Sequence, residues 1–170
     1  MDIKAIKKEL AGMLATLYVL DPLTGLPTSQ HMRANAEAPM SLADTDLPTW
    51  ILFVGAGTYP VPPDQTVERL TKETRDILCC LYVNLTQAGI DGEAERVVEP
   101  YIDYARSLIQ SHPLLYDGNI SDIVPGIMRA YLVRDDGIVV LPYGGPIQKY
   151  DGLRFVIRIE GLNESSYGNE

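Results

Sequence analysis

The segment spanning residues 131–162 constrains the fold more than any other part of the chain. It contains three apolar runs, which are separated at Asp136-Gly137 and at the stretch 143–146, and Asp151-Gly152 stands at the start of the last run. Asp-Gly and Gly-Gly pairs readily adopt positive φ, so each break predicts a turn between strands. The segment therefore predicts a three-stranded β-meander.

The last run alternates strictly in character after Gly152, as expected of a strand with one buried face. One face would carry four apolar side chains, Leu153, Phe155, Ile157 and Ile159. The opposite face would carry a mixed set, Arg154, Val156, Arg158 and Glu160. The sequence thus predicts a sheet that buries its apolar face and presents a mixed polar face.

Length and composition are those of a soluble globular protein. The chain has 170 residues, of which 46% are hydrophobic and 22% charged, enough for one domain with a core. The sequence has no run of eighteen apolar residues, so no membrane span is predicted. The charged, amphipathic N-terminus is unlike a signal peptide, which predicts a protein acting in a reducing cytoplasm.

The formal net charge of −9 argues against a surface that grips nucleic acid, because such a surface needs clustered Lys and Arg. It does not argue against a surface that nucleic acid slides past, since a negative wall repels phosphates. Acidity that merely aids solubility is the simpler explanation.

Cys79 and Cys80 are adjacent, so on a strand their side chains would point to opposite faces. A disulfide framework is not expected, and two cysteines with only two histidines make a poor metal set. The sequence therefore predicts no metal and no cofactor.

The N-terminal part predicts one helix, one strand and much irregular chain. Residues 2–19 have apolar positions at three- and four-residue spacing, which predicts a helix. Residues 21–47 show little periodicity, so they are either a long loop or a loop with a short helix at 30–38. The apolar run 50–54 predicts a buried strand, and the glycines and prolines of 55–65 predict a loop.

The middle of the chain predicts a strand followed by a long helix. Residues 66–86 fit either a helix or a strand, and β-preferring residues at 77–85 favour the strand. Residues 93–111 carry one apolar stripe and predict a helix, with Pro100 either kinking it or opening its main part. His112 is expected to cap the end of that helix.

A strand at 126–134 would then open the meander, so the predicted order is helix, two strands, helix and three strands. This order predicts an α+β fold, with two main helices packed on one face of a mostly antiparallel sheet. We expect a single domain over residues 1–170. Its irregular segment would span 21–47, a mobile loop 55–72, and a frayed tail 163–170.

No catalytic constellation is apparent in the sequence. It contains no nucleophile elbow, no zinc-protease motif and no phosphate-binding loop. His31 and His112 have no serine or cysteine at a supporting spacing. The Asp135-Asp136 pair precedes Gly137 and is interpreted as a solvated hairpin turn rather than an acid–base pair. We therefore expect no enzymatic activity and no catalytic residues.

Several short motifs, taken in order, resemble the tail terminator proteins of long-tailed bacteriophages. They cover about residues 45–162, and it is their order and spacing that carry the resemblance. The motifs are Asp46-Leu47-Pro48 before an apolar strand, Gly-x-Gly-x-Tyr at 55–59, Leu81-Tyr82-Val83 ending an Arg/Thr-rich strand, Gly92-Glu93-Ala94-Glu95-Arg96 with Glu99-Pro100, His112-Pro113-Leu114, Gly137-x-x-x-Leu-Pro-Tyr-Gly-Gly, and Tyr150-Asp151-Gly152 before the alternating strand.

The resemblance implies a structural virion protein of the tail neck, assembled in the host cytoplasm. Proteins of that family cap the finished tail tube as a ring, usually of six subunits, and present a surface to the head-side connector. The implied partners are other copies of the chain, the tail tube protein and the connector, with phage DNA passing through the lumen without specific binding and no membrane contact.

Polar and aromatic residues on the loops and strands are the candidates for these contacts. The expected interface residues are Tyr59, Arg69, Arg75, Tyr143, Tyr150, Arg154, Arg158 and Glu160. For the strand face at 154–160, a solvated outer surface is an equally good interpretation. Another neck component, such as a head-closure or tail-completion protein, is the nearest alternative function. A small-molecule-binding or enzymatic α+β domain would require a deep pocket with convergent polar groups.

Overall fold

The structure is a computed structural model, and it describes residues 2–21, 23–58, 70–83, 94–113, 115, 126–144 and 149–164. Two α-helices, seven β-strands and one short 3₁₀-helix lie in these ranges. In chain order they are α1 (Ile3–Leu14), β1 (Tyr18–Leu20), β2 (Pro27–His31), β3 (Arg33–Asn35), η1 (Asp44–Asp46), β4 (Thr49–Thr58), β5 (Leu70–Val83), α2 (Ala94–Ser111), β6 (Ile127–Pro142) and β7 (Lys149–Glu164).

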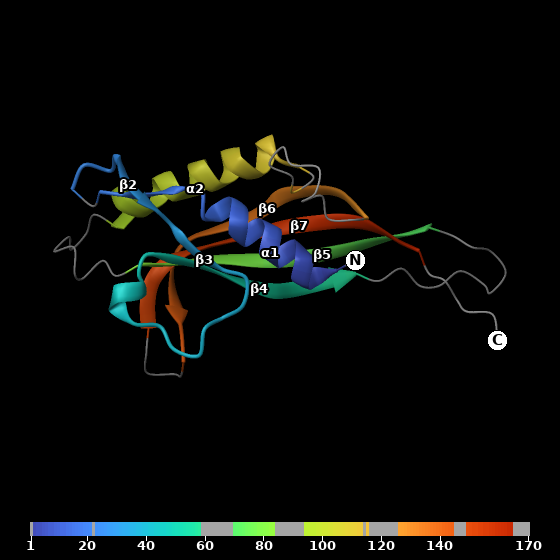
Figure 1. Ribbon diagram of the computed structural model, residues 1–170, viewed down its shortest axis with the longest axis horizontal. Coiled ribbons are helices and arrows are strands. Elements are labelled where there is room, and N and C mark those ends of the chain that lie inside the picture. The colour runs from blue at the N-terminus through green and yellow to red at the C-terminus, as the bar shows by residue number, and fades with distance from the viewer. Residues whose placement is uncertain are drawn as a thin grey trace.

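Five strands form the main sheet in the order β3-β4-β5-β7-β6, and β1 and β2 form a separate two-stranded sheet. All neighbouring strands are antiparallel except β3 and β4. Both helices lie on one side of the main sheet, with α1 over β3 and β4 and α2 over β6 and β7 (Figure 1). The predicted α+β class is therefore confirmed. Within the described ranges, neither helix is long and apolar enough to cross a membrane.

The main core lies between the helices and the sheet. Leu153, Phe155, Ile157 and Ile159 are fully buried there, which confirms the apolar face predicted for the last strand. Trp50 on β4 meets Phe155 edge to face, with ring centroids 5.3 Å apart. The core thus joins strands that are about a hundred residues apart in the sequence.

Helix α1 begins where predicted but ends five residues early. Asp2 caps its N-terminus, because its carboxylate accepts hydrogen bonds from the backbone N–H groups of Lys4 and Ala5. The chain then turns into β1, where the N–H of Leu20 donates to the Tyr101 hydroxyl at 2.7 Å. The prediction that the helix reaches residue 19 is wrong, because these tertiary bonds outweigh a helical spacing that continues to Leu17.

The prediction of an irregular segment at 21–47 is also wrong in part. The segment contains β2, β3 and η1, and no helix forms at 30–38. Strand β3 pairs in parallel with β4, Arg33 lying opposite Thr49. Such pairing leaves little local trace, because three residues are too few to show periodicity.

Strand β4 continues beyond its predicted end, through Gly55–Thr58. A Cβ atom at Gly55 would collide with the Leu78 side chain, and one at Gly57 would collide with the Arg75 guanidinium. These glycines therefore permit close cross-strand approach instead of forming a loop. The rest of the predicted loop at 59–65 lies outside the described residues. Residues 66–86 were predicted to form a strand in preference to a helix, and strand β5 confirms this for residues 70–83.

The C-terminal meander has two long strands where three were predicted. Asp136-Gly137 lies inside β6 as a β-bulge, where the register with β7 shifts and Gly137 has a φ of 66°. Asp151-Gly152 lies inside β7, which extends to Glu164 and so includes two residues of the predicted frayed tail. An Asp-Gly pair can thus mark a β-bulge or a close approach between strands as well as a turn.

Helix α2 confirms the helix predicted at 93–111 to within one residue, with Pro100 inside it. The backbone N–H of His112 donates to the Ile109 carbonyl, and its ring Nδ1 lies 3.0 Å from the Leu108 carbonyl oxygen. His112 therefore caps this helix, as expected.

Candidate interaction surface on the open sheet face

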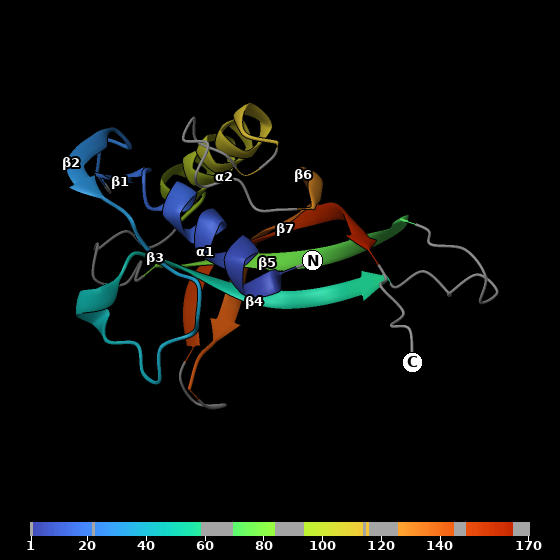
Figure 2. The ribbon, with the colours of Figure 1, turned by 45° about the vertical axis from the view of Figure 1, so that its right-hand side comes forward.

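The main sheet has a second face, opposite the two helices, and its two halves differ. Alternation along β5 and β7 places Asp76, Cys80, Arg154 and Arg158 on this open face. One half carries an aromatic cluster and the other half carries charged pairs. The helices lie on the other side of the sheet in both views of the ribbon (Figure 2).

The aromatic half is a second, smaller core. Tyr82 packs edge to face on Tyr143 and Tyr150, at centroid distances of 5.4 and 5.9 Å. The Tyr143 hydroxyl donates to the Pro39 carbonyl, and the Tyr150 hydroxyl donates to the Leu42 carbonyl at 2.9 Å. Burial raises the pKa of Tyr82 and of Tyr143.

Tyr143 and Tyr150 were predicted at an interface, and the structure corrects their role. Both are buried within the subunit, together with Leu42 from the chain segment 39–47 that covers them. Their hydroxyls fasten that segment to the sheet. Tyr143 and Tyr150 therefore pack inside the subunit, beneath the segment 39–47, and do not present a surface to a partner.

The charged half begins with a pair that spans β5 and β7. Arg158 donates from Nε and Nη2 to the two carboxylate oxygens of Asp76, at 2.7 and 2.9 Å. The two residues are directly opposite in the strand register. These hydrogen bonds and the negative charge of Asp76 raise the pKa of Arg158.

Glu160 forms the second charged group, with two residues of β6. It accepts hydrogen bonds from Arg129 Nε at 3.2 Å and from the Tyr131 hydroxyl at 2.9 Å. The Arg129 guanidinium also lies over the Tyr131 ring, 4.6 Å from its centroid. The charge of Glu160 and its hydrogen bond raise the pKa of Arg129.

Asp136 forms the third charged group and lies between two arginines. Its carboxylate oxygens are 2.6 Å from Arg154 Nε and 2.7 Å from Arg134 Nε. The hydrogen bond from Arg154, helped by Arg134, lowers the pKa of Asp136. The prediction of a solvated turn tip is therefore wrong for Asp136, because the bulge in β6 turns its side chain onto the open face.

The three charged groups share one layered arrangement, in which carboxylates lie beneath guanidiniums. The carboxylate side chains of Asp76, Asp136 and Glu160 are 10–17% exposed, whereas the arginine side chains are 38–62% exposed. We call this surface the arginine face, and it comprises Arg129, Arg134, Arg154 and Arg158 with the carboxylates beneath them. A partner approaching the sheet here would meet pinned, half-exposed cations.

The other predicted interface residues do not join the arginine face. Arg75 lies two positions from Ile77 on the helix-covered side of β5, and its side chain is largely buried near Glu73. Tyr59 and Arg69 lie outside the described residues. Arg154, Arg158 and Glu160 are brought together as predicted.

Sequence reasoning missed five residues of this surface, Asp76, Arg129, Tyr131, Arg134 and Asp136. The available signal was the alternation of charged residues along β5 and β6. That alternation identifies which residues share the arginine face only once the pairing of the strands is known. The bulges in β6 hide that signal further, because each one shifts the side-chain alternation by one residue.

Chemically, the arginine face offers hydrogen-bond donors in fixed positions, suited to carboxylate or other anionic groups. Among the described residues, no three His, Cys, Asp or Glu side chains are grouped so as to hold a metal ion. No protein-family model matches the chain, and no curated protein matches it either.

Proposed function

We propose that the protein is a structural virion protein that caps the head-proximal end of a phage tail tube. It would stop tube polymerisation there and provide the surface for head–tail joining, acting in the neck of the virion. The observation that carries the proposal is the arginine face, an open sheet surface whose cations are held in place before any partner arrives. The resemblance of the motifs at 45–162 to tail terminators supplies the biological setting.

The physical requirements of such a cap agree with this surface. A closed ring needs a heterologous contact, in which one patch of a subunit meets a different patch of the next. Arginine is enriched at protein interfaces because its fork binds acceptors directionally and its plane stacks on neighbours. Side chains already pinned by Asp76, Asp136 and Glu160 lose less conformational freedom on docking than free ones.

Ring formation and tube binding can be tested on the purified chain. The mass of the purified protein in solution is measured first, in the absence of any partner. The protein is then mixed with tail tubes and viewed by electron microscopy. We expect a ring, of six subunits by resemblance, that occupies one tube end and halts further growth. A chain that ignores tube ends but binds the head connector would instead indicate a head-closure protein, and binding to neither would overturn both functions.

A matched pair of variants tests the part played by the arginine face. Arg129→Ala/Arg134→Ala removes its two most exposed cations, which are 59% and 62% exposed. Lys4→Ala/Lys8→Ala removes the same charge from the exposed side of α1. We expect the arginine variant to lose ring formation or tube capping while the lysine variant keeps both.

A further inference from the structure

The acidity of this chain lies outside the arginine face. The face carries four arginines and three carboxylates, a formal charge of +1, while the whole chain carries −9. The rest of the chain therefore carries −10. In an acidic protein, an outward layer of cations such as the arginine face can complement acidic parts of the same protein's surface.

Helix α2 presents two acidic side chains on its exposed side. Glu99 and Asp103 are both exposed, and Tyr104 beside them is 43% exposed. Like charges at i and i+4 on a helix repel each other. Arg106 lies 3.7 Å from Asp103, whereas Glu99 has no ion pair among the described residues. A cation from outside would relieve this repulsion.

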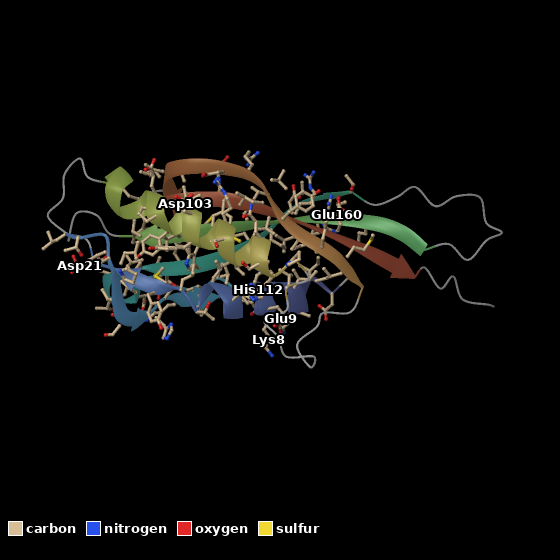
Figure 3. The ribbon with its side chains drawn as sticks, turned by 90° about the horizontal axis from the view of Figure 1, so that it is seen from above. Lys8, Glu9, Asp21, Asp103, His112 and Glu160 are labelled. Atoms are coloured by element: carbon tan, nitrogen blue, oxygen red, sulfur yellow. The ribbon has the colours of Figure 1, made fainter. Side chains whose placement is uncertain are left out.

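The acidic helix surface and the arginine face lie on opposite sides of the same strands. Helix α2 packs over β6 and β7, and the four arginines project from the other side of those two strands. Asp103 on α2 is on the helix side of the sheet (Figure 3). Since the sheet separates the two surfaces within one subunit, they can meet only between copies. Such a front-to-back contact is heterologous, the kind that generates rings.

We infer that the outward face of α2, with Glu99, Asp103 and Tyr104, docks on the arginine face of the next copy of the chain. The inference rests on the proposed ring function and names the two surfaces of its subunit contact. Arg129 and Arg154 each donate from Nε to a carboxylate of the arginine face, and a guanidinium has further N–H donors at its two Nη atoms that can reach incoming acids. The Tyr104 ring can stack on a guanidinium plane.

Charge exchange between the two surfaces tests the inference. Glu99→Lys/Asp103→Lys makes the helix surface basic, and Arg129→Glu/Arg134→Glu makes the opposite face acidic. We expect each variant alone to need at least a tenfold higher concentration for half-assembly than the wild type. The chain that combines all four substitutions, and an equal mixture of the two variants, should both recover rings.

Control variants separate this result from folding and from general charge effects. Glu9→Lys/Glu37→Lys changes the net charge by the same amount at positions outside both α2 and the arginine face, and it should assemble as the wild type does. Far-ultraviolet circular dichroism and the fluorescence of buried Trp50 check that each variant is folded. The inference is overturned if the helix variant assembles normally, or if folded partners fail to restore rings in the mixture.

The outcomes also distinguish this inference from the proposed function. Rings that obey the charge exchange but ignore tube ends would contradict tube capping alone. Rings that cap tubes and are unaffected by the exchange would contradict the α2 contact alone. A wild type that stays monomeric even on tubes would overturn the contact. The contact would also be overturned if Arg129→Glu/Arg134→Glu abolished binding to duplex DNA but left ring assembly intact, because the arginine face would then bind nucleic acid and not α2.

Discussion

Asp76 and Arg158 face each other across the β5–β7 pair, and the carboxylate accepts two hydrogen bonds from one guanidinium. The donors are Nε at 2.7 Å and Nη2 at 2.9 Å. A two-point contact of this kind fixes both side chains in one orientation. It holds Arg158 upright on the open face and connects strands whose pairing residues lie 82 positions apart in sequence.

A double-mutant cycle on Asp76→Ala and Arg158→Ala should reveal a positive coupling energy. The free energy of unfolding is measured by urea denaturation, with the fluorescence of Trp50 as the signal, since Trp50 is the only tryptophan and is fully buried. The exposed pair Lys4–Glu37, 3.9 Å apart with side chains 87% and 75% exposed, is the control. Its coupling should be several-fold smaller, because solvent screens an exposed pair. Equal couplings would show that the Asp76–Arg158 geometry confers no advantage.

Gly152→Ala should destabilise the protein by about 1 to 3 kcal/mol, the usual cost of overpacking. A Cβ atom at this position would run into the carbonyl oxygen of Leu81 on the neighbouring strand, and would lie 2.8 Å from Leu141 Cδ1. The carbonyl cannot retreat without breaking the β5–β7 pairing. Urea denaturation measures the change.

Gly12→Ala is the matched control for Gly152→Ala. A Cβ atom at Gly12 meets nothing within 4 Å, and the residue is in helix α1. Alanine there should stabilise the protein by about 0.5 kcal/mol, because glycine has greater backbone freedom in the unfolded chain. If both substitutions had the same effect, the close approach at Gly152 would be refuted.

Asp136→Asn should reduce stability at neutral pH and have less effect in acid. The pKa of Asp136 is lowered in the folded protein by hydrogen bonds from Arg154 and Arg134. Its ionised form therefore contributes stability above the unfolded pKa of about 3.9, and this contribution is lost as the pH falls through the lower folded value. The difference in unfolding free energy between wild type and variant should thus shrink between pH 6 and pH 2.5. A difference that is constant over that range would refute the ionised contact, and Glu37→Gln, at an exposed carboxylate, should change stability little at either pH.

Cys79 and Cys80 should resist thiol reagents in the folded protein. Burial raises the pKa of Cys80 to about 11, and burial also raises the pKa of Cys79. At pH 8 about one Cys80 in a thousand would then be a thiolate, compared with about a quarter of ordinary thiols. Ellman's reagent should label both residues only after unfolding. Rapid labelling of one thiol in the native protein would contradict the burial of that residue.

Much of the fold could be predicted because the signals were local. The alternation after Gly152 identified the buried face of β7, and the apolar stripe at 93–111 identified α2. The helix end at Leu14 could not be predicted, because Tyr101, far along the chain, captures the Leu20 N–H. The three-residue strand β3 was missed because its parallel partner, not its own sequence, makes it a strand.

The candidate surface was predicted only in part. Arg154, Arg158 and Glu160 were identified from their shared strand face, since residues two apart on a strand point the same way. Asp76 and Asp136 come from other strands, and no spacing in the sequence relates them to Arg158 or Arg154. The bulge at Gly137 decides that Asp136 reaches the open face at all.

The sequence by itself determined the fold class and the division of β7 into an apolar and a charged face, because both depend on short-range periodicity. The tertiary structure alone decided which carboxylate pairs with which arginine, and that Tyr143 and Tyr150 lie inside the subunit. The physical reason is that strand register and coverage by distant segments are set by the packing of the whole chain. Long-range packing therefore assembles the arginine face from residues whose spacing in the sequence does not connect them.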